Sequence, residues 1–172
     1  MEIQIRPELQ SEYELVEKVN RDAFNRDEES LLVHKIRKTP NYIPELSLVA
    51  SKKDIVIGHI MFTKVRIINE DTEFPSIALD PMSVAPKYQK KHIGSQLVLA
   101  GLDAAKELGY PHVIVLGHEN YYPKFGFVPA KTFGLLPSFD VPSTYFMARE
   151  LTKDSLAKIK GFVVYDDVFS EL

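Results

Sequence analysis

The sequence contains no cysteine among its 172 residues. That absence excludes disulfide bonds, thiolate zinc sites and a cysteine nucleophile, and it is typical of a reducing compartment. The net charge of −3 gives no overall positive charge of the kind that binds nucleic acid. No apolar run approaches the length needed to cross a membrane. We therefore expect a cytoplasmic protein that acts on neither nucleic acid nor membranes.

Several short catalytic motifs are also missing. The sequence has neither G-x-x-x-x-G-K-[ST] nor G-x-G-x-x-G, so it lacks the signatures of a P-loop and of a dinucleotide-binding fold. It has no G-x-S-x-G, which argues against a serine hydrolase. Its five histidines show no H-E-x-x-H or other paired spacing, and we expect no metal site.

The composition is that of one ordinary globular domain. Hydrophobic residues make up 45% of the chain and charged residues 26%. A chain of this length and composition can bury a sizeable core that needs no covalent or metal cross-links. Apolar and polar residues alternate over Met1–Arg6, which predicts a strand and not a signal peptide. We expect a single domain over residues 1–172. Its core should span about residues 1–130, followed by a C-terminal extension over about residues 131–172.

The first half of the chain has the pattern of strands joined by tight turns. Ser11-Glu12-Tyr13-Glu14 matches a capping box and predicts the start of a helix, and a second short helix is expected over residues 29–38. Alternating apolar residues predict strands over residues 46–50, 55–68 and 74–84. In the C-terminal part we expect strands over residues 145–148 and 161–165, with a helix over residues 152–159 between them.

The centre of the chain predicts a βαβ unit. After the strand that ends at Val84, apolar residues follow helical spacing from Leu97 to Leu108, and Gly109 stands where a helix often ends. The apolar run over residues 112–117 is typical of a strand covered on both faces. A crossover helix makes its two strands parallel. The fold class is therefore α/β with a mixed sheet, antiparallel at its start and parallel at its centre.

The turn over Gln89–Ser95 predicts an anion site. It leads from a strand into a helix, whose first turn presents backbone N–H groups and the positive end of the helix dipole. Lys87, Lys90 and Lys91 add positive charge, so a phosphate or pyrophosphate is the expected ligand. The alternative is an ordinary surface turn that happens to carry lysines.

Two segments resemble the GCN5-related N-acetyltransferases, the GNAT superfamily. Gln89-Lys90-Lys91-His92-Ile93-Gly94 resembles the Q/R-x-x-G-x-G/A segment of that family, and Asn120-Tyr121-Tyr122-Pro123-Lys124-Phe125-Gly126-Phe127 resembles its Y-x-x-x-G-F block. They stand in the family's order, with a helix and a strand between them. The segment Leu79-Asp80-Pro81-Met82-Ser83-Val84 is similar to the bacterial YhbS-like branch.

The resemblance implies an acyl-CoA N-acyltransferase fold with splayed central strands and helices on both faces of the sheet. Acetyl-CoA would be the cosubstrate. Pro81 cannot donate to a strand ladder and so belongs at an edge, a bulge or a break; it would mark the splay, the alternative being an ordinary strand end. The residues expected to bind the cosubstrate are Met82, Val84, Gln89, Lys90, Lys91, His92, Ile93, Gly94, Ser95, Asn120 and Phe125.

His92 departs from the family pattern, because it replaces the first glycine. Glycine lets the backbone come close to a ligand and accepts a positive φ. We expect the turn to keep its function if His92 has a negative φ, with an affinity for CoA that is retained but lower than with glycine.

The resemblance also assigns catalytic roles. Tyr122 would protonate the departing CoA thiolate as a general acid, although a purely packing role for it stays open. Asp80 and His118, the latter with Glu119 beside it, are the candidates for the general base.

The predicted function is transfer of an acetyl group from acetyl-CoA to a primary amine of a small molecule, peptide or protein. Transfer would be direct, in a ternary complex, because no nucleophile for a covalent intermediate is evident. The alternative is a non-catalytic acyl-CoA-binding sensor or partner-binding module. A homodimer is possible.

Overall fold

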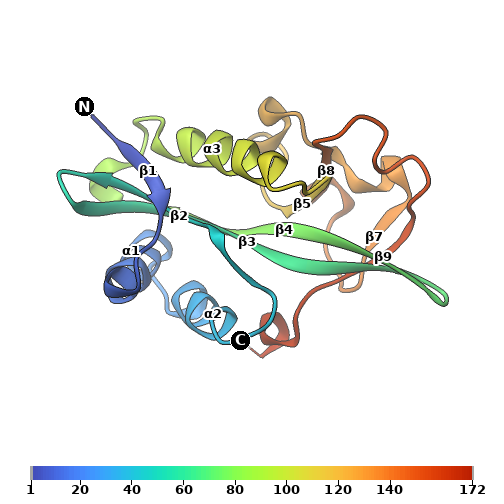
Figure 1. Cartoon of the computed structure of the whole chain (residues 1–172), viewed down its shortest axis with the longest axis horizontal. Coiled ribbons are helices and arrows are strands. Elements are labelled where there is room, and N and C mark those ends of the chain that lie inside the picture. Colours follow the sequence, from blue (N-terminus) through green and yellow to red (C-terminus); the bar gives the residue numbers. More distant parts are fainter. Residues whose placement is uncertain (1, 172) are drawn as a thin grey trace. The chain divides into compact units, whose positions relative to one another are not determined.

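The computed structural model describes residues 2–171 as a mixed sheet with helices (Figure 1). Along the sheet the strands follow the order β1-β2-β3-β4-β5-β8-β6, and β9 pairs with both β3 and β7. The chain divides into two compact units. Unit 1 comprises residues 1–63, 80–104 and 167–172, and unit 2 comprises residues 64–79 and 105–166. The α/β mixed-sheet fold class is confirmed.

Unit 1 begins with three antiparallel strands. They are β1 (Gln4–Pro7), β2 (Tyr42–Lys52) and β3 (Ile55–Asn69), of which the part up to Thr63 belongs to this unit. The turn between β2 and β3 is as short as predicted, and its two residues Lys53 and Asp54 have φ of 47° and 65°. Register pairs such as Ala50 with Gly58 and Leu48 with Ile60 hold β2 against β3.

Helices cover both faces of the unit 1 strands, as expected. The helices α1 (Tyr13–Phe24) and α2 (Glu28–Ile36) lie on one face, and α3 (Ile93–Glu107) lies on the other (Figure 1). Met61 of β3 belongs to the apolar cluster of α1 and α2. Its neighbour Phe62 points the other way and contacts Gly101 of α3. Because successive side chains of β3 point to opposite faces of the sheet, they pack against helices on both faces.

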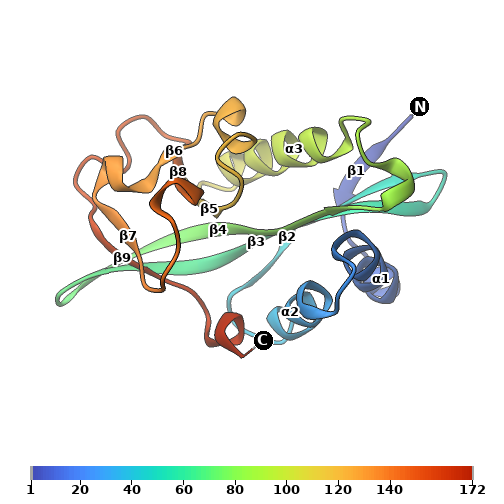
Figure 2. The same cartoon turned by 180° about the vertical axis from the view of Figure 1, so that it is seen from behind.

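Unit 2 contains the parallel pair predicted from the βαβ pattern. Strand β4 (Thr72–Val84) pairs in parallel with β5 (His112–Leu116), with Ile77 to Leu79 facing Val113 to Val115. The antiparallel strand β8 (Phe146–Glu150) follows β5, and β6 (Val128–Pro129) pairs with β8. Strands β7 (Leu135–Pro137) and β9 (Gly161–Val164) lie side by side in parallel (Figure 2).

Three-residue and four-residue 3-10 helices link these elements. They are η1 (Gln10–Glu12), η2 (Pro86–Tyr88), η3 (Tyr122–Phe125), η4 (Ala130–Phe133), η5 (Ser143–Tyr145) and η6 (Asp167–Ser170). In unit 1, Val168 and Phe169 of η6 pack against the apolar cluster of α1 and α2. No helix within residues 2–171 is long and apolar enough to span a bilayer.

Two local predictions are wrong. The capping box does not lie at Ser11–Glu14, because Gln10–Glu12 forms a 3-10 turn and the carboxylate of Glu12 accepts the N–H of Leu9 at 2.9 Å. Residues 152–159 form successive turns instead of a helix. Asp154 has a φ of 63°, a left-handed value that a right-handed helix does not allow.

The break predicted at Pro81 has a clear counterpart in unit 2. The parallel register between β4 and β5 ends at Leu79, directly before Asp80-Pro81. Strand β4 itself continues to Val84, so Pro81 is not an ordinary strand end.

Candidate functional site

The predicted phosphate turn lies in unit 1, between the end of β4 and the start of α3. The amide of the Gln89 side chain donates to the carbonyl of Val84 at 2.9 Å, and the N–H of Ala85 donates to the carbonyl of Ile57 at 2.8 Å. The 3-10 turn η2 closes with the N–H of Gln89 on the carbonyl of Pro86. These bonds hold the start of the turn against the end of β4 and against β3.

The backbone of the turn corrects the expectation for His92. His92 has a φ of 64° and Lys90 a φ of 62°, so both residues adopt the left-handed conformation. A histidine thus occupies the backbone state for which the family pattern has glycine. The helix begins at once, because the carbonyl of His92 accepts the N–H of Gln96 at 3.1 Å. The turn keeps its shape without a glycine at residue 92.

Positive charge gathers around the ring of Tyr88. The ammonium groups of Lys52, Lys87 and Lys91 lie 5.6, 5.9 and 5.7 Å from its centroid. Lys90 and His92 are exposed beside them. Neither Lys52 nor Tyr88 was predicted for this site. Lys52 stands 35 residues before Lys87 in the chain, and only the fold brings it to Tyr88. The ammonium groups around Tyr88 therefore give this part of the surface a local positive charge.

The end of β4 presents alternate residues in unit 1. Pro81 and Ser83 are buried, whereas Asp80, Met82 and Val84 are only half-buried. The pKa of Asp80 is raised to about 7 by burial of its carboxyl group and by the negative charge of Glu29, against the opposing charge of Arg26. Although the residue keeps some exposed surface, the raised pKa lets its carboxylate exchange a proton near neutral pH.

Tyr122 lies in unit 2, in the turn that follows β5. The carbonyl of His118 accepts the N–H groups of both Tyr121 and Tyr122, at 3.0 and 3.3 Å. The ring of Tyr122 is 8% exposed and lies edge-on to the rings of Tyr121 and Phe127. It sits at the start of η3, which ends at Gly126 with a φ of 89°. That glycine in the Y-x-x-x-G-F block therefore serves a left-handed turn.

The other predicted residues of unit 2 surround this turn. Phe125 is buried, and its ring lies 6.4 Å from that of Tyr122. Asn120 is exposed, and its N–H donates to Nδ1 of His118 at 3.2 Å. In this arrangement a backbone N–H engages Nδ1 of His118.

The structure brings the predicted residues together in two groups. Asp80, Met82, Val84 and the turn Gln89–Ser95 belong to unit 1, and His118, Asn120, Tyr122 and Phe125 belong to unit 2. Within residues 2–171, no group of three or more His, Asp or Glu side chains is placed to hold a metal ion.

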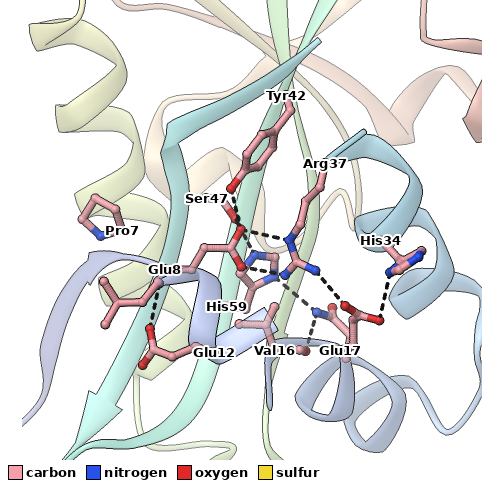
Figure 3. A network of polar contacts seen from close by, with 12 residues as sticks. Pro7, Glu8, Glu12, Val16, Glu17, His34, Arg37, Tyr42, Ser47 and His59 are labelled. Carbon is pink, nitrogen blue, oxygen red and sulfur yellow. Dashed lines mark hydrogen bonds and ion pairs between the residues drawn. The ribbon is translucent and has the colours of Figure 1, made fainter. Parts of the chain in front are cut away.

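A buried polar network in unit 1 was not predicted (Figure 3). The fully buried carboxylate of Glu8 accepts hydrogen bonds from Arg37, Tyr42 and Ser47, the shortest at 2.6 Å. Arg37 also pairs with Glu17 at 2.7 Å and lies 3.9 Å from the centroid of the Tyr13 ring. The network links Glu8, which follows β1, to Glu17 of α1, to Arg37 at the C-terminal end of α2 and to Tyr42 and Ser47 of β2.

The hydrogen bonds around His59 determine its tautomer in this network. Ser47 donates to the carboxylate of Glu8, which leaves its oxygen to accept Nε2–H of His59 at 3.0 Å. Asn20 donates one amide hydrogen to the carbonyl of Val16 and the other to Nδ1 of His59. His59 is therefore neutral, in agreement with a pKa lowered to about 4, mainly by burial.

Comparison with known proteins identifies similar sequences. The sequence model of the acetyltransferase (GNAT) family matches residues 7–127. The uncharacterized N-acetyltransferase YhbS of Escherichia coli K12 is 32% identical over 167 residues, which cover 96% of this chain and 98% of that protein. The uncharacterized N-acetyltransferase YjhQ of the same strain is 33% identical over 114 residues, covering 66% of this chain and 63% of that protein.

Two solved structures of acetyltransferases are also similar to this chain. The crystal structure of Escherichia coli YhbS in complex with CoA matches with a TM-score of 0.91 and 29% identity, covering 98% of this chain and 92% of that chain. A GNAT family acetyltransferase from Brucella melitensis in complex with acetyl-CoA matches with a TM-score of 0.80 and 27% identity, covering 98% of both chains.

Proposed function

Because the chain belongs to the acetyltransferase (GNAT) family, we propose that it transfers the acetyl group of acetyl-CoA to a primary amine. The observation that carries the proposal is the turn Gln89–Ser95. Its two left-handed residues, the helix that starts directly after them and the lysines around Tyr88 together fit the pyrophosphate of CoA.

In this proposal unit 1 binds the cosubstrate. Backbone N–H groups over Gln89–Ser95 hold the pyrophosphate. Backbone groups of Met82 and Val84 pair with the pantetheine arm as a neighbouring strand would. The half-burial of both residues supports that role, because it leaves one side of the strand accessible. In unit 2, Asn120 and Phe125 would contact the same cosubstrate.

The chemistry we propose is direct transfer in a ternary complex. The ammonium group of the acceptor loses one proton to Asp80, whose pKa of about 7 suits a base at neutral pH. The neutral amine nitrogen then attacks the thioester carbonyl, whose oxygen is polarised by a backbone N–H near Val84. As the amide forms, the nitrogen releases its second proton to solvent, the C–S bond breaks, and the phenol of Tyr122 protonates the departing CoA thiolate.

The acceptor is an amine of a small molecule, peptide or protein. Residues 20–45 and 131–150 are the proposed determinants of its selection. A single domain over residues 1–172, a cytoplasmic location and a possible homodimer stay predictions.

The first test is calorimetric titration of acetyl-CoA into the purified protein. We expect saturable one-to-one binding that weakens as salt is added, because the ligand carries phosphates and the turn carries lysines. Absence of binding at millimolar acetyl-CoA would overturn the proposal at its first step.

The second test measures turnover by release of the CoA thiol across a panel of amines. Replacing the acid in Tyr122→Phe should lower kcat by about 10²-fold or more without changing the affinity for CoA. The adjacent Tyr121→Phe is the matched control. It removes a phenolic hydroxyl group from the same turn and should leave kcat within about threefold of the wild type. Binding without turnover of any amine would support a sensor instead of an enzyme.

A further inference from the structure

Gly117 lies directly after β5 in unit 2, with its N–H donating to the carbonyl of Tyr145 at 2.9 Å. A Cβ atom at this position would lie 2.2 Å from Cε2 of Tyr122, 2.7 Å from Cδ2 and 3.3 Å from Cζ. Non-bonded carbon atoms prefer a separation of about 3.5–4.0 Å. The tyrosine ring therefore occupies the space that any side chain at residue 117 would need.

A left-handed backbone is not the reason for a glycine at this position. The glycines with a left-handed φ are Gly109, Gly126, Gly134 and Gly161, and Gly117 is not one of them. What a side chain at residue 117 would meet is the ring of Tyr122.

The ring has little room to move aside. It is 8% exposed, and the rings of Tyr121, Phe125 and Phe127 lie 5.1, 6.4 and 5.7 Å away, centroid to centroid. Its own backbone N–H is held by the carbonyl of His118. A side chain at residue 117 must therefore displace the phenol against these aromatic neighbours.

We propose that Gly117 is a positioning residue for acetyl transfer, which sets the phenol of Tyr122 in place by having no side chain. This inference rests on the proposed role of Tyr122 as general acid. It adds a requirement outside the Y-x-x-x-G-F block, at the residue where β5 ends. A misplaced catalytic group can cost about 10²-fold in rate even when the substrate still binds.

The test is a double-mutant cycle of Gly117→Ala and Tyr122→Phe. Gly117→Ala should lower kcat by at least about tenfold, while calorimetry finds the affinity for CoA within about twofold of the wild type. In the Tyr122→Phe background the same glycine change should lower kcat no further, because no hydroxyl remains to be misplaced. Independent losses that multiply in the double variant would overturn the inference.

Gly109→Ala serves as the matched control. It strains a left-handed backbone at a φ of 91°, yet its Cβ would meet nothing within 4 Å. It should therefore lower stability and leave kcat within about twofold. An equal loss of kcat in Gly109→Ala would show that general destabilisation, and not the ring of Tyr122, explains the effect.

If Gly117→Ala does not fold, thermal unfolding of the double variant Gly117→Ala/Tyr122→Ala tests whether the ring of Tyr122 is the cause. Removing the ring should restore a folded protein, and failure to do so would overturn the inference. The outcomes also separate this inference from the proposed function. A wild type without turnover refutes the function. Conversely, an active wild type with an impaired Tyr122→Phe and a fully active Gly117→Ala refutes only the role of Gly117.

Discussion

At the scale of single residues, His92 shows what the sequence could and could not reveal. The replacement of a glycine was visible, but the φ of 64° was not. A left-handed conformation costs a non-glycine residue about 1 kcal/mol. We therefore expect the departure from the family pattern to lower the stability of the fold.

Replacing His92 by glycine tests its effect on ligand binding. We expect His92→Gly to bind acetyl-CoA with an affinity equal to the wild type or up to about threefold higher, since loss of the side chain lets the backbone approach the ligand. Calorimetry measures the change. His92→Asn, which keeps a side chain that tolerates a left-handed φ, is the control. A large loss of affinity in both variants would mean that the imidazole itself binds the ligand.

His59 predicts a specific dependence of stability on pH. Its pKa is lowered from 6.5 to about 4 by burial, and among its charged neighbours Glu8 opposes the shift and Arg37 adds to it. Between about pH 4 and pH 6.5, His59 is protonated in the unfolded chain and neutral in the folded chain. The stabilisation is thus complete above pH 6.5 and is lost as the pH falls towards 4, by about 3 kcal/mol in total.

The variant His59→Gln tests this contribution. A glutamine can donate to Ser47 and accept from Asn20, as the neutral imidazole does, but it does not titrate. Urea unfolding between about pH 7 and about pH 4.5 should show a steeper loss of stability for the wild type. The pKa of Glu8 is also lowered, despite its burial, by its hydrogen bond from Arg37, by the charge of His59 and by its hydrogen bond from Ser47. Because His59 contributes to that shift, the difference between the two profiles reports the coupled pair His59 and Glu8. Parallel pH profiles would refute the prediction.

At the scale of elements, periodicity predicted most of the fold. The long helix, the apolar strand β5 and the tight turns that join β2 to β3 and β3 to β4 all have local causes in the sequence, and the structure confirms them. The failures are also local. The chain makes the 3-10 turn Gln10–Glu12 before α1, and the capping bond is the one from the N–H of Leu9 to Glu12. A left-handed Asp154 interrupts a helix that its neighbours favour.

The packing of α3 on β3 depends on one glycine. A Cβ at Gly101 would lie 2.4 Å from Cε1 of Phe62, so α3 would have to move away from the strand. Alanine improves helix propensity by about 1 kcal/mol, but overpacking a core costs about 1–3 kcal/mol. We expect Gly101→Ala to lower the free energy of unfolding, measured by urea denaturation. Adding Phe62→Leu should recover part of the loss, and no recovery would show that another contact is responsible.

At the scale of the whole molecule, the contacts that matter most join distant parts of the chain. Glu8, Arg37 and His59 meet in one network although 51 residues separate the first from the last. Lys52 reaches Tyr88 in the same manner. Neither meeting has a sequence signature, because pattern and propensity are local whereas these contacts depend on sheet register and helix placement. The turn and the Tyr122 block were predictable because each is contiguous.

The net charge of −3 sets the last prediction, since the proposed ligand is itself an anion. The overall repulsion acts over long distances and is screened within about 10 Å at 0.1 M salt. The attraction must come from lysines close to the phosphates. Two unit charges about 7 Å apart in water interact by about 0.6 kcal/mol, so removing one such lysine should weaken binding about threefold.

Lys52→Gln, next to Tyr88, is expected to show this loss and a smaller dependence of affinity on salt. Lys53→Gln removes the same charge one residue away, at the exposed tip of the same turn, and should bind acetyl-CoA like the wild type. Equal losses in both variants would mean that net charge alone controls binding and that the lysines around Tyr88 form no local site.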